Sequence, residues 1–196
     1  MPTHRTVQGP DWDLVNPKAP FQPRDSQGEF THDRHLWILG GWYTPKTLAP
    51  RDVWKSADGV NWTCTVDEAP WIHGDLPATI VHDGRLWIMG GRRMPGDTCY
   101  NQVWSSTDGT AWRKEAEYAG WSERVGHSFT VFHDRMWVMV GAASFYEHDN
   151  TTMYNDVWSS ADGVDWRLET HAPWSKRAHA FAVVFKDKIW LMGGGA

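Results

Sequence analysis

Short apolar segments separated by polar turn residues run along the whole chain. Each segment is apolar, or alternates apolar with polar, over about 5 to 7 residues and is bounded by Gly, Asp, Asn or Pro, a pattern typical of β-strands and turns. No segment has the periodicity of an amphipathic helix. The chain is therefore predicted to be all-β.

The strand pattern repeats with a period of about 50 residues. The segment LWILGG at residues 36–41 returns as LWIMGG at 86–91, MWVMVG at 136–141 and IWLMGG at 189–194. A second block follows the first three: DVWKSADGVNW at 52–62, QVWSSTDGTAW at 102–112 and DVWSSADGVDW at 156–166. An aromatic residue and an arginine come next, as in FQPR at 21–24, WSER at 121–124 and WSKR at 174–177, whereas the second copy has WIHG at 71–74.

Each unit is predicted to form four antiparallel strands. In the third copy these are an inner strand a at residues 128–132, b at 135–141, c at 156–160 and an outer strand d at 166–169. The short a-b connections, such as HDG at 82–84 and HDR at 133–135, place polar residues at the reversal, as tight hairpins require.

The recurring residues have structural explanations. Each Gly-Gly pair ends strand b where the chain turns away, and glycine readily takes a positive φ there. In the c-d turns, Asp58, Asp108 and Asp162 are expected to accept backbone N–H bonds beside a left-handed glycine. The 15 Trp residues, all but Trp42 in repeat register, are expected to fill the space between neighbouring units, each burying on the order of 200 Å².

These motifs resemble the kelch family, whose unit is a double-glycine strand end followed by a Tyr- and Trp-marked strand pair. YNQVW at 100–104 with Trp112, and YNDVW at 154–158 with Trp166, carry the resemblance. The SxDGxxW turn also looks like a shortened Asp-box, the structural turn of sialidase-type propellers. The resemblance covers nearly the whole chain and implies an all-β, kelch-like β-propeller of about four four-stranded antiparallel blades.

Residues 1–196 are interpreted as one propeller domain. Its repeats span residues 17–67, 68–117 and 118–173, and a closing blade combines 1–16 with 174–196. There, residues 2–7 are a degenerate strand c and 11–15 a strand d, which gives sixteen strands in all. Kelch rings usually have six or seven blades, so three arrangements stay open: a closed small ring, a half-ring that forms a homodimer, and a fragment of a larger propeller.

Composition narrows the function classes. A formal net charge of −5 provides no basic field for nucleic acid or an anionic membrane surface, so neither is expected as a partner. No apolar run reaches the length of a membrane span, and residues 1–10 lack a secretion-signal pattern, which leaves the cytoplasm as the default localisation. Cys64 and Cys99 have no metal-binding spacing, and no cofactor or metal is predicted.

Candidate binding residues are sought where the copies differ, because residues shared by every copy explain the fold. The b-c connections at 42–51, 92–100 and 142–154 differ most, and in a propeller they share a face with the d-a connections. The predicted ligand-binding set on this face is Trp42, Tyr43, Arg92, Arg93, Arg124, His127, Phe145, Tyr146, Glu147, His148, Arg177 and His179. Because the pairs Arg124/His127 and Arg177/His179 recur at nearly the same offset, a structural hydrogen-bonding role between blades is the alternative for them.

Aromatic rings beside Arg, His and acidic groups suit a sugar or an acidic peptide. The sequence therefore favours a non-catalytic binding or scaffold module with a protein or carbohydrate partner. The alternative is a carbohydrate-active enzyme, resembling sialic-acid or galactose-oxidase-like propellers, that uses the same face. No GxSxG or HExxH motif is present, and the Tyr, His and cross-linked Cys of galactose oxidase have no match, so no catalytic residue is assigned.

Overall fold

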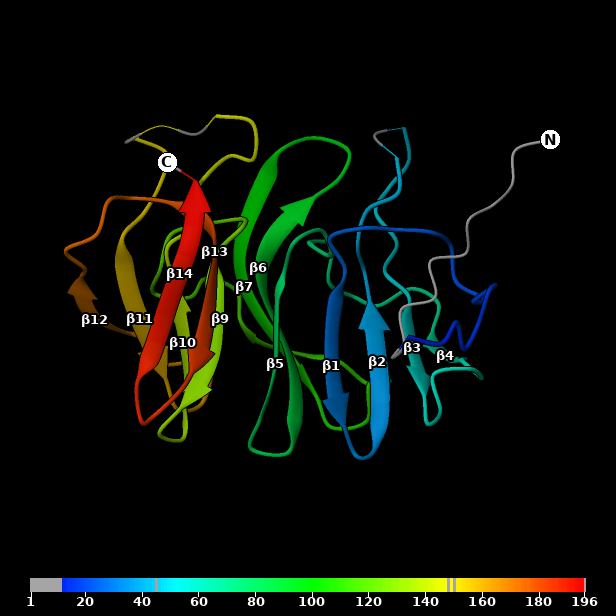
Figure 1. Ribbon diagram of the computed structural model, residues 1–196. Helices are drawn as coiled ribbons and strands as arrows, with labels where there is room; N and C mark the ends of the chain where they lie inside the picture. The colour runs from blue at the N-terminus through cyan, green and yellow to red at the C-terminus, as the bar shows by residue number, and fades with distance from the viewer. Residues whose placement is uncertain (1–11, 45, 148, 150, 196) are drawn as a thin grey trace.

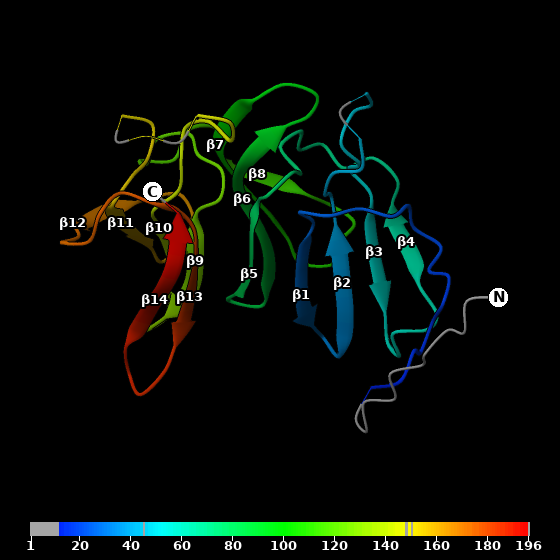
Figure 2. The same cartoon turned by 45° about the horizontal axis from the view of Figure 1, so that its top comes forward.

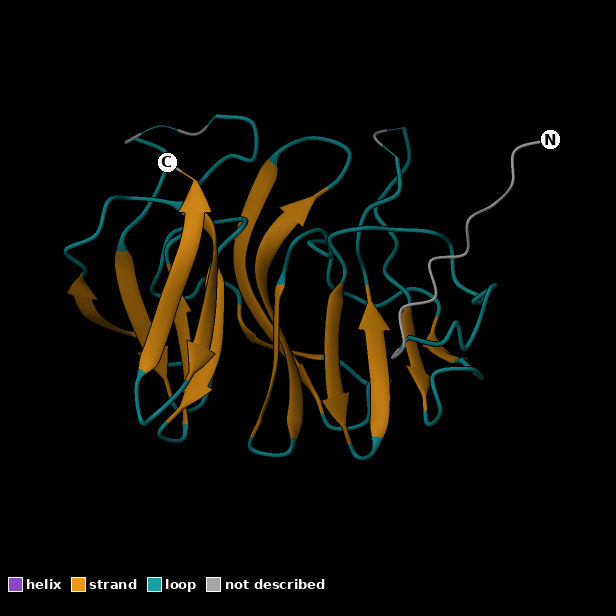
Figure 3. Cartoon of the chain, viewed as in Figure 1, coloured by secondary structure: helices purple, strands orange, loops and turns teal. Residues whose placement is uncertain are grey.

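The computed structural model describes residues 12–44, 46–147, 149 and 151–195, which form strands and loops without a helix (Figures 1 and 3). The first sheet contains β1 (Gly28–His32), β2 (His35–Leu39), β3 (Val53–Ser56) and β4 (Thr63–Val66). The second contains β5 (Ala78–His82), β6 (Arg85–Arg93), β7 (Thr98–Ser106) and β8 (Arg113–Ala116). The third contains β9 (Ser128–Phe132), β10 (Arg135–Met139), β11 (Asp156–Ser160) and β12 (Arg167–His171), and the fourth β13 (Ala178–Val184) and β14 (Ile189–Gly195).

The four antiparallel sheets are arranged as the blades of a β-propeller. Their first strands form the inner row, in which β5 lies against β1 and β9, and β9 against β13. In Figure 2 the first sheet lies to the right, the second in the middle, and the third sheet and the β13–β14 hairpin to the left, where they overlap. The predicted all-β propeller class is therefore confirmed. Within the described residues no helix is long and apolar enough to cross a membrane.

The turns follow the predicted chemistry. Each a-b hairpin has a two-residue loop with positive φ at both positions, as at Asp83 and Gly84, the type I′ geometry that matches the twist of paired strands. In the first c-d turn, Asp58 Oδ1 accepts the N–H groups of Val60 and Asn61, and Gly59 has φ of 75°. Asp108 and Asp162 repeat the arrangement.

Tryptophans of the b strands pack between neighbouring sheets, as predicted. The Trp37 ring lies over Gly109 in the c-d turn of the second sheet, so close that a Cβ there would be 2.2 Å from it. Trp87 lies in the same way over Gly163 of the third sheet. Each indole N–H donates to a carbonyl of its own hairpin, Trp37 to His32 at 3.2 Å and Trp87 to His82 at 3.0 Å.

The closing blade differs from the sixteen-strand expectation. Residues 1–11 lie outside the described residues, and residues 12–15 form no strand, so the fourth sheet contains only β13 and β14 in the described part of the chain. Residue 16 lies at the opposite end of the row, where Asn16 Nδ2 donates to the Val60 carbonyl at 2.8 Å. The fourth sheet, by contrast, packs beside β9, so residues 12–15 do not pair with β14.

Candidate functional site

The b-c and d-a connections lie on one face of the molecule, the upper one in Figure 1. The a-b and c-d turns lie on the other. The twelve residues proposed for binding come from the connections of the first face, but the structure places them in quite different environments.

Arg92 is buried at the end of β6 and joins two b-c connections. Its Nε donates to Asp75 Oδ2 at 2.5 Å and its Nη1 to Asp97 Oδ1 at 3.1 Å, and its guanidinium lies 4.0 Å from the Phe145 ring centroid. Asp97 in turn accepts the Ser144 hydroxyl at 2.5 Å and the Phe145 N–H. Burial alone would raise the pKa of Asp97, but the bonds from Ser144, Phe145 and Arg92 hold it below its usual value. Arg92 therefore anchors the third b-c connection to the second.

Arg124 is fully buried within the third sheet. Its Nη1 and Nη2 donate to the two carboxylate oxygens of Asp156 at 2.7 and 2.8 Å, and Nη1 also donates to the Val140 carbonyl. Arg24 binds Asp52 and the Gly40 carbonyl in the same way in the first sheet. The structural alternative thus describes Arg124 well, with the bonds lying within one blade.

The second sheet performs this role with different residues. Gly74 and Gln102 occupy the places of the arginine and the aspartate. His73 Nδ1 lies 2.6 Å from the Gly90 carbonyl oxygen, the counterpart of the carbonyls that Arg24 and Arg124 bind. The WIHG segment is therefore a structural substitution in this blade.

His127 is buried against Trp121. Its Nε2 lies 3.2 Å from the Met89 carbonyl oxygen, and Nδ1 is buried without a hydrogen-bond partner. Burial, and then the nearby charge of Arg124, lower the pKa of His127 to about 3. The ring is therefore neutral near pH 7.

The similar spacing within the pairs Arg124/His127 and Arg177/His179 does not mean that the two histidines occupy equivalent positions in the repeat. Counting back from Trp137 and Trp190, His179 corresponds to Gly126 and is exposed. Gly126 and His179 both have a positive φ, 61° and 58°, and Leu76 and Ser26 hold the same place in the other sheets with φ of 51° and 55°. The left-handed backbone is thus a feature of the repeat, and it is tolerated without glycine in three copies.

The remaining predicted residues lie nearer the surface. Phe145 links the anchored connection to His179, with ring centroids 5.7 Å apart, and to Tyr146, at 5.3 Å. Arg177 is half-buried, and its Nη1 donates to the Gly193 carbonyl at 2.9 Å. Trp42 is half-buried, and Tyr43, Arg93, Tyr146 and Glu147 are exposed, whereas His148 lies outside the described residues.

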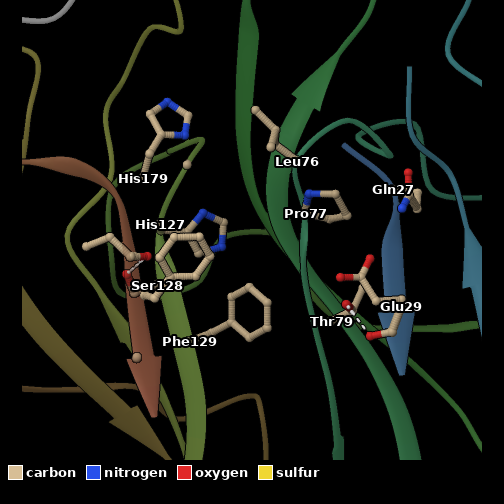
Figure 4. Close-up of a pocket in the computed structure, with 13 residues that line it drawn as sticks. Gln27, Glu29, Leu76, Pro77, Thr79, His127, Ser128, Phe129 and His179 are labelled. Atoms are coloured by element: carbon tan, nitrogen blue, oxygen red, sulfur yellow. Dashed lines mark hydrogen bonds between the residues drawn. The ribbon is translucent and has the colours of Figure 1, made fainter. Parts of the chain in front are cut away.

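A cleft of about 410 Å³ opens between the inner strands of all four sheets (Figure 4). We call it the inner-strand cleft. Phe129 and His127 face it from one side, and Thr79, Gln27 and Glu29 from the other. Burial raises the pKa of the Glu29 carboxyl above its usual value. The full lining is Gln27, Glu29, Leu76, Pro77, Thr79, Gly126, His127, Ser128, Phe129, His179, Ala180, Phe181 and Ala182.

Of the predicted residues that the structure describes, only His127 and His179 also line the cleft. The sequence carried a signal for the others, because the a strands also differ between copies: Glu29, Thr79, Phe129 and Ala182 hold equivalent positions. These differences lie within strands and not in the connections, where the binding residues were predicted. No group of three metal-ligating side chains is found among the described residues.

No protein-family model and no curated protein matches the chain. Among solved structures, that of YjhT is similar, with a TM-score of 0.71 and 18% sequence identity over 89% of this chain and 60% of the other. At this identity the likeness establishes the fold. The chain spans 60% of the length of that β-propeller-type chain.

Proposed function

We propose that the chain is a kelch-type propeller module that binds a saccharide in the inner-strand cleft without transforming it. The observation that supports this proposal most directly is the lining of the cleft, in which Glu29 and Gln27 lie opposite the Phe129 ring. Saccharides present hydroxyl groups around their edge and C–H groups on their faces, so they match sites that combine polar side chains with aromatic rings.

The cleft also has a suitable size and electrostatic character. Its volume of about 410 Å³ lies within the range of roughly 300–1,000 Å³ of small-molecule sites. Glu29 is exposed to solvent on the cleft, where partial burial of its carboxyl raises its pKa, and it can accept hydrogen bonds from saccharide hydroxyl groups. His179 lines the cleft and contacts the Phe145 ring of the third b-c connection, on the face proposed from the sequence.

Binding is favoured over catalysis by the titratable groups of the cleft. Glycoside hydrolysis generally uses two carboxyl groups on either side of the scissile bond, and Glu29 is the one carboxylate among the described lining residues. His127, with a pKa of about 3, is a poor proton acceptor near neutral pH because a general base works best with a pKa near the working pH.

A glycan array and a peptide array on the purified chain test this proposal. We expect binding to saccharides, weakened at least about tenfold, or about 1.4 kcal/mol, by Glu29→Gln and by His179→Gly. Glycine suits the left-handed φ of 58° at residue 179, so this change removes the imidazole without straining the backbone. Tyr118→Ala, an exposed position after β8, is the matched control and leaves binding unchanged.

Three results would contradict the proposal. Binding to peptides alone would assign the face to a protein partner. Saccharide binding that survives both cleft variants would place the site elsewhere. Chemical conversion of a bound saccharide would favour the carbohydrate-active enzyme.

A further inference from the structure

The fourth sheet exposes an apolar surface. Side chains alternate along its strands, so that Ala180, Ala182 and Leu191 pack toward the third sheet. The opposite surface carries four large apolar side chains that are 43 to 75% exposed: Phe181, Val183, Trp190 and Met192. An exposed apolar cluster of this kind marks a contact surface.

The paired residues of the hairpins show which contact the equivalent surface makes in a sheet that is followed by another sheet. Phe181 pairs with Met192 and Val183 with Trp190 in the fourth sheet. The equivalent pairs in the second sheet are Ala78 with Met89 and Ile80 with Trp87. Those four residues are at most 7% exposed, because they form the core between the second and third sheets. The fourth sheet thus carries the side of an inter-blade interface that faces the next blade.

The complementary side lies on the first sheet. Trp37 and Trp87 each cover the glycine of the next c-d turn, whereas among the described residues a Cβ at Gly59 would meet only Leu36, at 3.6 Å. Leu36 itself is 43% exposed, although its counterparts Leu86 and Met136 are fully buried. No tryptophan of the described residues therefore covers the Gly59 turn, which leaves it accessible to a tryptophan of a preceding blade.

The segment before β1 extends this side. In the interior of the row, Thr65 of β4 donates its hydroxyl to the Gly109 carbonyl at 3.0 Å, across the boundary to the next sheet. Asn16 donates to the Val60 carbonyl, beside Gly59, at 2.8 Å. Residue 16 thus contacts the first sheet as an outer strand of a preceding blade would.

We propose that these two surfaces bind each other between two copies of the chain, head to tail, with Trp190 of one copy on the Gly59 turn of the other. Within one copy they do not meet, because the fourth sheet packs on the third and the first sheet on the second. A second copy offers the matching surface, in a geometry that the chain already forms at Gly109 and Gly163. Heterologous contacts form a ring when their rotation closes, and the form that we propose is the closed ring of two copies.

Light scattering on the size-separated protein, over a dilution series, tests the proposal. We expect the wild-type chain at twice its monomer mass, and Trp190→Ala and Gly59→Asn each at monomer mass. Asn accepts a left-handed backbone, and among the described residues a Cβ at Gly59 meets only Leu36, so Gly59→Asn blocks this contact surface and leaves the monomer folded, as circular dichroism checks. Neither residue lines the inner-strand cleft, although Phe181 of the same apolar surface does, so saccharide binding is measured separately on the monomeric variants, which keep the whole cleft lining. Tyr118→Ala is the control and stays dimeric.

A mixture of the two variants gives a sharper result. Trp190 of the Gly59→Asn chain still matches Gly59 of the Trp190→Ala chain, so the mixture is expected to recover dimer that neither variant forms alone. A wild-type chain that is monomeric throughout the series overturns the proposal. So does a dimer that persists in both variants, or a mixture that stays monomeric.

Discussion

Replacing Arg124 with Met is expected to lower the free energy of unfolding by about 3–5 kcal/mol, the usual result of removing one partner of a buried ion pair. The guanidinium donates to both carboxylate oxygens of Asp156, at 2.7 and 2.8 Å, and to the Val140 carbonyl at 2.8 Å. Arg124→Met leaves Asp156 as a buried carboxylate without its cation and the carbonyl without its donor.

The second sheet suggests a compensating change. Gln102 stands where Asp156 does, and its Oε1 accepts the Trp104 indole N–H at 3.1 Å, as Asp156 accepts that of Trp158 at 2.7 Å. Adding Asp156→Gln to Arg124→Met removes the unpaired charge and keeps this acceptor. The uncapped carbonyl remains, at a cost of about 1–3 kcal/mol, so the double variant is expected to regain about 2 kcal/mol over Arg124→Met.

Urea unfolding at pH 7, followed by Trp fluorescence, measures the full double-mutant cycle. Arg167→Met is the control, because its ion pair with Glu169, at 2.6 Å, is largely exposed on the arginine side. Such a pair contributes about 0–1 kcal/mol. The reasoning is refuted if the double variant is no more stable than Arg124→Met, or if Arg167→Met costs as much as Arg124→Met.

The same pair predicts a pH dependence. Burial would raise the pKa of Asp156, but the bonds from Arg124 and Trp158 hold it below its usual value. A depressed native pKa stabilises the fold above the unfolded-state pKa of about 3.9, and this contribution is lost as the pH falls through the native pKa. Arg124→Met lacks the contribution, so the stability gap between the wild type and this variant is expected to narrow below about pH 4.

Two further predictions concern stability. Gly109→Ala and Gly84→Ala both place a side chain at positive φ, which lowers the free energy of unfolding by about 1–2 kcal/mol. Only residue 109 lies under Trp37, so Gly109→Ala should cost a further 1–3 kcal/mol, about the usual cost of overpacking, and have the lower melting temperature. Equal melting temperatures would contradict the packing. Burial lowers the pKa of His127 from 6.5 to about 3. Wild-type stability should therefore fall as the pH drops from 6.5 toward 4, because this residue takes up a proton in the unfolded chain but not in the folded one. In urea titrations, His127→Gln should reduce that fall by up to about 1.4 kcal/mol per pH unit. Identical slopes would mean that His127 is not neutral in the fold.

Most of the fold could be predicted from the repeat, because strand periodicity and turn chemistry are local properties of the sequence. Strands β9 and β11 have the predicted bounds, and the three SxDG turns bond as expected. The N-terminal closure was not predictable in this way, since whether residues 12–15 pair with β14 depends on the angle between sheets. For the site, burial decided the outcome: Arg92 was predicted to bind a ligand, and Arg124 either to bind a ligand or to form structural hydrogen bonds. Their partners Asp75 and Asp156 lie in other segments of the chain.

A difference between repeat copies indicates function only when nothing else in the blade compensates for it. In the second sheet the lost arginine is matched by Gln102 in place of the aspartate and by His73 on the Gly90 carbonyl, so this difference is accounted for by structure. The inner-strand series of Glu29, Thr79, Phe129 and Ala182 has no such compensation, since Glu29 has no ion pair within the described residues and faces the cleft. Glu29 is exposed to solvent, so the fold does not require a carboxylate at this position, and its place on the cleft is consistent with the saccharide site that we propose.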